Sequence, residues 1–544
     1  MAVNVYAPGC HLLCHDDVIG SRRVSYILYL TDPDTPWQAS WGGALRLYPT
    51  EEKKDSDGKS VKIPSAEWSK VIPPAWNQLS FFAVQPGESF HDVEEVYARQ
   101  KGESEKDGGR IRMAISGWFH IPQEGEDGYE EGLEEKLAER SSLQQLQGKN
   151  DEFDLPQEQW NEYDGDGKTA AEELEEKDFD FLLQFMTPQY LAPDTVDELS
   201  DLFAEESSLQ LSNFLSQKFS TQLKSEILAF DASAEPNGYW RTAAPPHKHR
   251  YRFQHPNISS SQIADESAYN RLLNTFLPSL AFRKWLSLAT GLTLKKSNIL
   301  ARRFRRAIDY TLATGYEKDD AQLEFCLNCT PSSGWGGDAA EDAVEGAGDA
   351  EEKKSNGKAK GKGKGKGKGK GKAPAPKEEE VEVEEEEETN VGGYEIYMAG
   401  DDDNDDDHDD GASDAGSDHG VTIPAHAASA TGAGNRRQSR KKGNGKGKAD
   451  PAIYQAAGDE DDDGILFSNP AAWNTLSVVL RDRGVLRFVK YVSTAARGDR
   501  WDFVGEVGVE GGDEGDGEEE DGAGVEEGED EDEEDEEGDE EDGE

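Results

Sequence analysis

The stretch Cys14-His15-Asp16-Asp17-Val18 stands just before a strong β-strand pattern at 24–30, which ends at the turn Thr31-Asp32-Pro33-Asp34. Further short apolar runs follow at 44–48, 79–84 and 111–121, separated by segments that carry Gly, Pro or acidic residues. Short strands at this spacing predict a sandwich or barrel rather than alternating strands and helices. The sequence therefore predicts a β-barrel domain over residues 1–125.

Four side chains of this barrel predict a metal site with a carboxylate anchor. His15 and Asp17 form a His-x-Asp motif, and His91 follows the turn Pro86-Gly87, where a barrel rim is expected. Two imidazoles and one carboxylate on one face are typical of non-haem iron(II) oxygenases, because they leave coordination positions open. Arg112 opens the next strand and can grip a carboxylate with two parallel hydrogen bonds. We interpret the four residues as a site for iron and 2-oxoglutarate.

The residues alone leave an alternative open. His-x-Asp is weak evidence in a chain where 114 of 544 residues are acidic, and His408-Asp409-Asp410 matches it inside an acidic run with no strand. His15 and His91 could simply satisfy hydrogen bonds near a core. His247 and His249 also have a ligand-like spacing, but their Pro-rich, basic surroundings favour a loop.

The second half of the chain repeats part of the first. Trp76-Asn77-Gln78-Leu79-Ser80 recurs as Trp473-Asn474-Thr475-Leu476-Ser477, and Trp41-Gly42-Gly43 recurs as Trp335-Gly336-Gly337. Two copies of one β-fold explain this similarity. The position as far from Trp473 as His91 is from Trp76 is Phe488, so we expect the second copy to lack the metal site.

Composition divides the rest of the chain into an acidic connector, a second domain and polar segments. Residues 126–177 are expected to be the connector, and 178–507 the second domain, in which helical periodicity precedes strands. Only 34% of the chain is hydrophobic and its net charge is −56. Insertions at 338–390 and 401–450, and an acidic tail at 508–544, are therefore expected to be disordered. The basic runs within the insertions could touch nucleic acid, although pairing with acidic neighbours is the favoured interpretation.

The start of the sequence shows no secretory leader, and no apolar run is long enough to span a bilayer. Four cysteines exclude a disulfide framework and suit a reducing cytosol or nucleus. Cys326-Leu327-Asn328-Cys329 has zinc-like spacing, but it lacks a second pair nearby, so a buried strand is favoured.

At these residues the chain resembles the eukaryotic prolyl hydroxylases that modify a small-subunit ribosomal protein of the decoding centre, a family of 2-oxoglutarate- and iron-dependent oxygenases. The segments that carry the resemblance are Leu13-Cys14-His15-Asp16-Asp17-Val18-Ile19, Trp41-Gly42-Gly43-Ala44-Leu45-Arg46-Leu47-Tyr48, Phe90-His91-Asp92-Val93-Glu94-Glu95-Val96, the run 112–122 and the run 484–493. Together they extend over most of residues 3–507 apart from the insertions.

The resemblance implies a mainly β protein with flanking helices and two double-stranded β-helix (jelly-roll) domains, the second of them degenerate. It implies that His15, Asp17 and His91 hold Fe(2+), and that Arg112, Tyr29 and Tyr6 contact 2-oxoglutarate. Oxygen is then the co-reactant and ascorbate a supporting reductant. It further implies a prolyl substrate in a ribosomal protein, a link to translation-termination factors and oxygen-linked regulation, and a location in nucleus and cytoplasm without a membrane.

The sequence also departs from this family. It begins close to Tyr6, so we expect the first strands of the catalytic barrel to be missing, and residues 98–109 look inserted. A barrel without those strands would expose ladder edges. A rival expectation is therefore a non-catalytic acidic scaffold, or an oxygen-sensing regulator, that binds protein partners.

Overall fold

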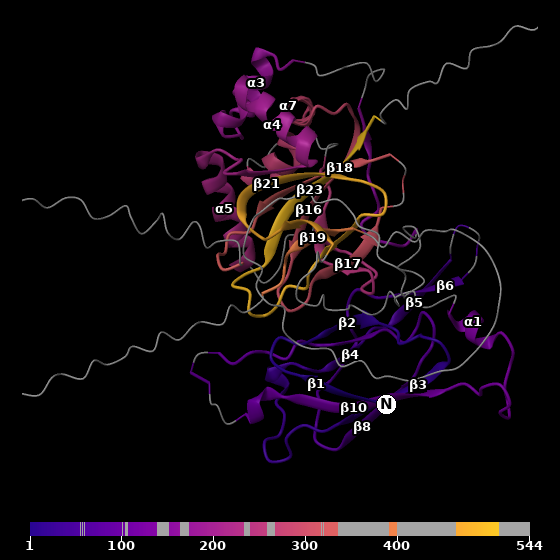
Figure 1. The fold of residues 1–544 in the computed structure, drawn as a ribbon. Helices are drawn as coiled ribbons and strands as arrows, with labels where there is room; N and C mark the ends of the chain where they lie inside the picture. The colour runs from indigo at the N-terminus through magenta and orange to yellow at the C-terminus, as the bar shows by residue number, and fades with distance from the viewer. Residues whose placement is uncertain are drawn as a thin grey trace, which may run out of the picture. The chain divides into compact units, whose positions relative to one another are not determined.

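The computed structural model describes residues 1–138, 152–163, 173–232, 240–257, 267–335, 391–399 and 464–510, apart from residues 55, 57, 59, 101, 104–106, 317 and 319 within those ranges (Figure 1). The expected disordered insertions, 338–390 and 401–450, lie outside the described residues, as does the acidic tail from residue 511 on. No helix among the described residues is both long and apolar enough to cross a membrane.

The first domain consists of two four-stranded antiparallel sheets. One has the order β1-β10-β3-β8 and the other the order β2-β9-β4-β7. Apart from β4 and β7, which pair in one sheet, successive strands of the two sheets alternate between them, so the connections wind the chain into a jelly roll. The strands are β1 (Ala2–Tyr6), β2 (Leu12–His15), β3 (Arg22–Tyr29), β4 (Leu45–Leu47), β7 (Lys70–Ile72), β8 (Gln78–Ala83), β9 (His91–Val93) and β10 (Arg112–His120), with a side hairpin of β5 (Thr50–Lys54) and β6 (Ser60–Pro64).

Strands from the start of the sequence contribute to both sheets of the first domain. β1 pairs with β10 over five residues, and β2 pairs with β9, so both sheets have four strands. Ala2–Tyr6 has the alternating pattern of a strand with one face toward the core. The expected absence of earlier barrel strands stays a prediction.

The second domain has the same arrangement with larger sheets. Its eight-stranded sheet has the order β12-β21-β18-β23-β16-β15-β13 with β11 on β16, and its five-stranded sheet the order β14-β17-β22-β19-β20. The fold class expected from the sequence is thereby confirmed. The strands are β11 (Asn161–Glu162), β12 (Ser208–Ser212), β13 (Arg241–Thr242), β14 (His249–Arg250), β15 (Arg252–Gln254), β16 (Leu294–Phe304), β17 (Tyr310–Gly315), β18 (Gln322–Cys329), β19 (Glu395–Met398), β20 (Ile465–Asn469), β21 (Trp473–Arg481), β22 (Leu486–Val489) and β23 (Arg500–Val509).

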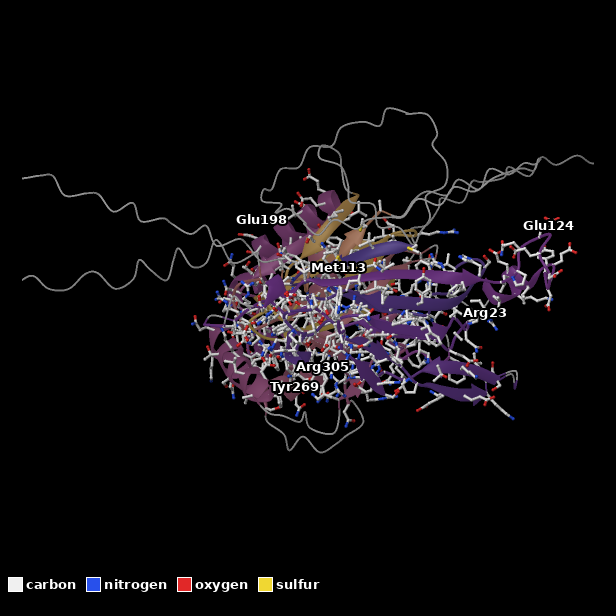
Figure 2. All side chains as sticks on the ribbon, turned by 90° about the horizontal axis from the view of Figure 1, so that it is seen from below. Arg23, Met113, Glu124, Glu198, Tyr269 and Arg305 are labelled. Carbon is white, nitrogen blue, oxygen red and sulfur yellow. The ribbon has the colours of Figure 1, made fainter. Side chains whose placement is uncertain are left out.

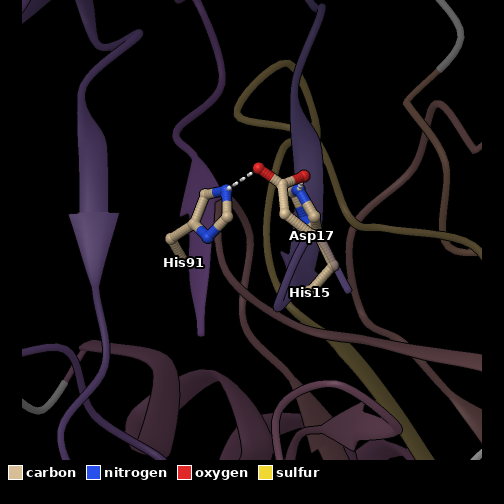
Figure 3. A group of neighbouring side chains, drawn as sticks. All are labelled: His15, Asp17 and His91. Carbon is tan, nitrogen blue, oxygen red and sulfur yellow. Dashed lines mark ion pairs between the residues drawn. The ribbon is translucent and has the colours of Figure 1, made fainter. Parts of the chain in front are cut away.

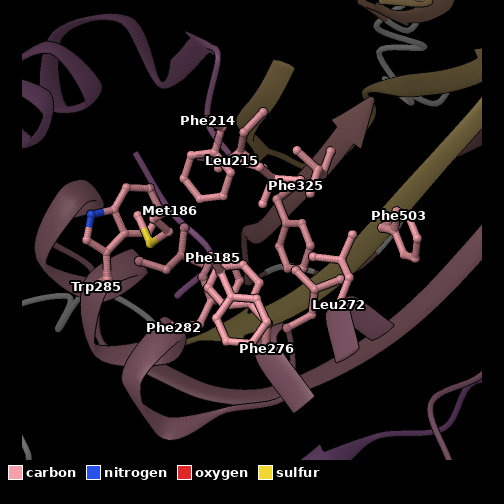
Figure 4. Packing of buried hydrophobic residues seen from close by; sticks show 14 of the residues in the cluster. Phe185, Met186, Phe214, Leu215, Leu272, Phe276, Phe282, Trp285, Phe325 and Phe503 are labelled. Atoms are coloured by element: carbon pink, nitrogen blue, oxygen red, sulfur yellow. The ribbon is translucent and has the colours of Figure 1, made fainter. Parts of the chain in front are cut away.

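Helices cover the outer face of the eight-stranded sheet and form the main core with it (Figure 4). Phe325 and Phe503 of the sheet pack there against Phe276, Phe282 and Trp285 of the helical layer. The helices are α1 (Leu133–Ala138) in the connector, then α3 (Glu176–Leu182), α4 (Pro193–Glu206), α5 (Gln217–Ala232), α6 (Ala268–Arg271) and α7 (Leu280–Thr290), with short turns at Ala39–Trp41, Gly108–Arg110, Pro188–Leu191 and Leu272–Phe276.

The pairs Gly42-Gly43 and Gly392-Gly393 show which residues of the two domains occupy equivalent positions. A Cβ atom on Gly42 would lie 2.0 Å from the carbonyl oxygen of Glu95, and one on Gly392 would lie 1.8 Å from that of Tyr491. Glu95 and Tyr491 are therefore equivalent, and counting back four residues makes Arg487 the counterpart of His91. Phe488 was the wrong expectation, because the segment after the turn is one residue shorter in the second copy, and a slip by one moves a side chain to the opposite face.

The tryptophan that was expected to match Trp41 also takes another place. In the second domain Trp335 lies against Gly393, as Trp37 lies against Gly43 in the first. Trp335 is thus the counterpart of Trp37, and the Gly-Gly pair comes from residues 392–393 instead of 336–337.

The β1-β10-β3-β8 sheet of the first domain and the eight-stranded sheet of the second domain differ in their outer faces. In the first domain this face is apolar and open among the described residues. Its most exposed side chains are those of Val3, Val5, Leu79, Phe81 and Phe119. Met113 of β10 and Arg23 of β3 also belong to this sheet (Figure 2). In the second domain the equivalent positions are buried under the helices.

Candidate metal and cosubstrate site

The three predicted metal ligands converge at the rim of the first barrel (Figure 3). His15 ends β2 and His91 begins β9, and the two residues face each other across the strand pair. Asp17 lies two residues after His15, and its carboxylate lies between the two imidazole rings. The distances are 3.3 Å from His15 Nε2 to Asp17 Oδ1 and 3.7 Å from His91 Nε2 to Asp17 Oδ2. Possible ligand atoms of all three residues lie within 4.8 Å of one another, the only such group among the described residues.

Backbone carbonyls orient both imidazoles. His15 Nδ1 lies 2.8 Å from Leu13 O, and His91 Nδ1 lies 2.8 Å from Ser89 O. A carbonyl can only accept, so each Nδ1 carries a proton and each neutral ring keeps its lone pair on Nε2. The two Nε2 atoms face the Asp17 carboxylate, as the ligand atoms of one metal ion would have to do.

The charges of the group are tuned by burial and by one another. Burial would raise the pKa of Asp17, but its contacts with His15, His91 and Trp118 hold that pKa well below its ordinary range. Burial, assisted by the charge of His15, lowers the pKa of His91 to about 4. Burial acts on His15 in the same sense, yet the hydrogen bond and charge of Asp17 outweigh it and raise the pKa. An ionised carboxylate and a neutral His91 are the forms that bind a metal ion.

Arg112 is buried in the same barrel without a counter-ion. Its side chain is on the inner face of β10 and is 2% exposed, and its Nε donates to Gly43 O over 2.7 Å. The guanidinium lies 4.7 Å from the ring centre of Tyr6 and 5.1 Å from that of Tyr29. No carboxylate among the described residues forms an ion pair with it. A buried cation in this state favours an anionic ligand, since desolvation without a partner is costly.

Two tyrosines line the space beside Arg112. The hydroxyl of Tyr29 is buried and makes no hydrogen bond of ordinary geometry with the described residues. Burial raises the pKa of Tyr6, and the charges of both Arg112 and Asp17 act on that hydroxyl. Tyr6 is therefore within electrostatic reach of the anchor and of the metal ligands. A hydroxyl beside an arginine that has no carboxylate partner among the described residues suits one end of a dicarboxylate.

In the second domain, ion pairs occupy the position that is equivalent to the surroundings of Arg112. Arg500 is the counterpart of Arg112, because both donate to the second glycine of the pair, Gly393 and Gly43 respectively. Arg500, however, pairs with Asp502 at 2.9 Å and with Glu395 at 3.6 Å. The positions equivalent to these two acids in the first domain are Ala114 and Leu45. The first barrel thus keeps the arginine and lacks the acids that would neutralise it.

The equivalents of the metal ligands are also replaced. Arg487 stands in the place of His91 and pairs with Glu395 at 2.8 Å and Glu324 at 2.9 Å. Thr314, which faces Arg487 as His15 faces His91, stands in the place of His15. An ion-pair network therefore fills the second barrel where the first has a metal triad and a free arginine.

The other motifs from the sequence do not join a metal group in the part of the chain that is described. Cys326 and Cys329 are buried free thiols of β18 whose pKa burial raises. His247 is buried and stacks on Phe90 with ring centres 4.7 Å apart. His249 Nε2 contacts Leu155 O at 2.8 Å. Sequence reasoning missed Trp118, whose indole contacts Asp17, although Trp118 lies within a quoted segment.

The donor set fits iron and 2-oxoglutarate. Two neutral imidazoles and one carboxylate match a facial triad, and the unpaired arginine matches the far carboxylate of the cosubstrate. A double-stranded β-helix with such a site defines the class of 2-oxoglutarate- and Fe(II)-dependent oxygenase folds.

Comparison with known families gives the same class. Residues 1–120 match the 2OG-Fe(II) oxygenase superfamily model. Residues 177–515 match the family described as oxoglutarate and iron-dependent oxygenase degradation C-term. Since the latter match extends over more than half of the sequence, the chain belongs to that family.

Several characterised proteins are similar to the chain. A prolyl 3,4-dihydroxylase of Ostreococcus tauri is 30% identical over 344 residues, which is 60% of this chain and 61% of the relative. A prolyl 3-hydroxylase of Mus musculus is 27% identical over 44% of this chain and 33% of the relative. One of Xenopus laevis is 41% identical over 20% of this chain and 17% of its own length. The chain thus spans less than two thirds of these relatives.

The crystal structure of a Pseudomonas putida prolyl-4-hydroxylase aligns with 57% of this chain and 98% of its own, at 11% identity and a TM-score of 0.26. Similarity at this level supports no inference.

Proposed function

We propose that the chain is a 2-oxoglutarate- and Fe(II)-dependent dioxygenase that hydroxylates prolyl residues in a polypeptide. The observation that carries this proposal is the buried Arg112, which has no carboxylate partner among the described residues, in the barrel that holds the His15-Asp17-His91 group. A metal-binding scaffold would not need an uncompensated guanidinium, whereas a cosubstrate carboxylate would neutralise it. The names of the similar proteins supply the prolyl substrate.

In this proposal each residue has a defined task. His15, Asp17 and His91 hold the iron, and Arg112 with Tyr29 and Tyr6 orients 2-oxoglutarate by its far carboxylate. Iron and 2-oxoglutarate together supply the oxidising chemistry, in which oxygen is consumed and 2-oxoglutarate is decarboxylated to succinate. No side chain is required as a proton-transfer base.

The finer assignment follows the family resemblance. We infer that the substrate is a small-subunit ribosomal protein at the decoding centre, with consequences for translation termination and oxygen-linked regulation. Such a basic substrate would suit a chain with a net charge of −56 electrostatically. Ascorbate as supporting reductant, contacts with termination factors, and action in nucleus and cytoplasm belong to the same proposal.

Peptide-dependent succinate formation tests the activity. We expect turnover by the wild type, loss in His15→Ala, and a loss of at least about tenfold in kcat/KM for 2-oxoglutarate in Arg112→Ala, since a hydrogen bond to a charged group contributes about 1.5–3 kcal/mol. Arg23→Ala, an exposed arginine of the same sheet, is the matched control and should behave as wild type. Wild-type turnover no faster than that of His15→Ala would contradict the enzyme and favour a scaffold.

A further inference from the structure

The indole of Trp118 contacts the carboxylate of the metal triad. Trp118 Nε1 donates to Asp17 Oδ2 over 3.2 Å. This is the oxygen that faces His91, while Oδ1 faces His15. Trp118 lies on β10, six residues after Arg112, so both side chains point from the same face of that strand. One strand therefore carries the cosubstrate anchor and a donor to the metal ligand.

The backbone gives Asp17 little support of its own. Asp17 lies beyond the end of β2 and has φ of 63°, in the left-handed region that non-glycine residues rarely adopt. The neighbouring Asp16 is fixed by Val18 N at 3.2 Å and Gly87 N at 3.3 Å. Side-chain contacts restrict rotation of the Asp17 carboxylate, and among the described residues Trp118 is the one neutral donor to it.

The cationic side chain of Arg22 contacts the indole ring of Trp118. The guanidinium carbon of Arg22 lies 3.7 Å from the centre of the Trp118 ring, a close cation–π contact. Arg22 begins β3, the strand that pairs with β10. The contact fixes the plane of the indole and so the direction of its N–H. Arg22, Trp118 and Asp17 form a chain of contacts that ends at the metal site.

The repeat provides a control for this arrangement. Trp118 pairs across the sheet with Ser25, and the equivalent pair in the second domain is Glu506 with Glu324. Glu506 lies 3.7 Å from Arg487, the residue in the place of His91. The tryptophan is thus absent from the copy that lacks the triad, as a role tied to the metal site requires.

We propose that Trp118 is a positioning residue for the metal site, which rests on the proposed function above. Because its N–H engages Oδ2, Oδ1 would be the oxygen that Asp17 offers to the metal ion. Partners of this kind, one shell outside a metal, typically change metal affinity 10- to 100-fold when removed. Arg22 contributes more weakly, through the orientation of the ring.

Anaerobic titration with Co(II), followed by its visible absorption, tests the proposal without turnover. We expect Trp118→Phe to raise the Kd for Co(II) about 10- to 100-fold and to alter the absorption of the bound ion. Arg22→Gln should shift both readouts in the same direction but less. Trp76→Phe, a half-exposed tryptophan outside the site, is the matched control. Unchanged Kd and spectrum in Trp118→Phe would overturn the proposal.

Thermal melting of each metal-free variant shows whether that variant is folded. If Trp118→Phe is unfolded, Co(II) binding by Arg22→Gln provides the test. The outcome is separable from that of the proposed function. Weaker Co(II) binding in Trp118→Phe, with a wild type that forms no succinate, supports the positioning role and contradicts the hydroxylase. Normal succinate formation by the wild type with unchanged Co(II) binding in the variant contradicts the positioning role alone.

Discussion

Arg112 and Arg500 show how a single neighbouring residue changes the use of the same side chain. Both are buried and both donate to a glycine carbonyl in their barrel. Asp502 neutralises Arg500, whereas Ala114 occupies the equivalent position beside Arg112. Arg112 can be predicted from the sequence because it follows His91 at the start of the next strand. The absence of its counter-ion could not be predicted, because it depends on which residues face it across two sheets.

Replacing Ala114 by an acidic residue should neutralise Arg112 and so weaken the binding of the cosubstrate. In Ala114→Asp we expect the new carboxylate to pair with Arg112, as Asp502 pairs with Arg500. The affinity for 2-oxoglutarate should fall at least about tenfold, which corresponds to about 1.4 kcal/mol, while Co(II) affinity changes little. Calorimetric titration with 2-oxoglutarate measures the effect. Ala114→Asn is the uncharged control, and an equal loss in both variants would argue against ion pairing as the cause.

His247 should make the stability of the protein depend on pH. Burial lowers its pKa to about 3, and neither ring nitrogen has a hydrogen-bond partner among the described residues. The unfolded chain, with an ordinary pKa near 6.5, binds the proton first as pH falls, so this contribution to stability is complete above pH 6.5 and is lost toward pH 3. Between pH 7 and 5 the loss is about 2 kcal/mol.

His247→Phe should reduce that pH dependence, since it keeps the stacking on Phe90 and removes the titrating group. The measurement is the urea midpoint of wild type and variant at pH 7 and pH 5. His120→Phe, which alters an exposed histidine, serves as control. The same slope with pH in wild type and His247→Phe would contradict the assignment.

At the scale of elements, the strand pairs place the chemistry. β2 and β9 bring His15 and His91 to one rim because the residues face each other in the pairing register. Local patterns in the sequence predicted β3, β4, β8 and β10, and they marked His15, Asp17, His91 and Arg112 as candidate site residues. The repeat pattern assigned the wrong counterparts to His91 and to Trp41. Both assignments depend on register and long-range pairing, which short-range periodicity does not encode.

The outer faces of the equivalent sheets allow a matched test of burial. Leu79 of β8 is 58% exposed, and its counterpart Leu476 of β21 is fully buried under the helices. Leu79→Ala should therefore cost less than about 0.5 kcal/mol, and Leu476→Ala about 2–5 kcal/mol. Denaturant unfolding measures both. Equal costs would mean that the face of the first barrel is covered in solution.

At the scale of the molecule, residues 1–510 form one compact unit in which the two barrels touch. Glu95, four residues after His91, accepts hydrogen bonds from Ser493 Oγ at 2.5 Å and Thr494 N at 2.8 Å. Its counterpart Tyr491 stacks on His11 with ring centres 3.9 Å apart. Equivalent positions thus meet at the contact, as in a two-fold pair of subunits. The second barrel, filled by ion pairs, supports the rim that carries the metal ligands.

The central claim is that one barrel of this pair binds a metal ion and a keto-acid together. Anaerobic titration of the Fe(II)-loaded protein with 2-oxoglutarate, followed by the visible charge-transfer absorption of the chelate, measures this directly. We predict a saturable absorption band in the wild type, a much weaker affinity in Arg112→Ala, and no band in His91→Ala. A wild type that takes up Fe(II) but develops no band with 2-oxoglutarate would contradict the account.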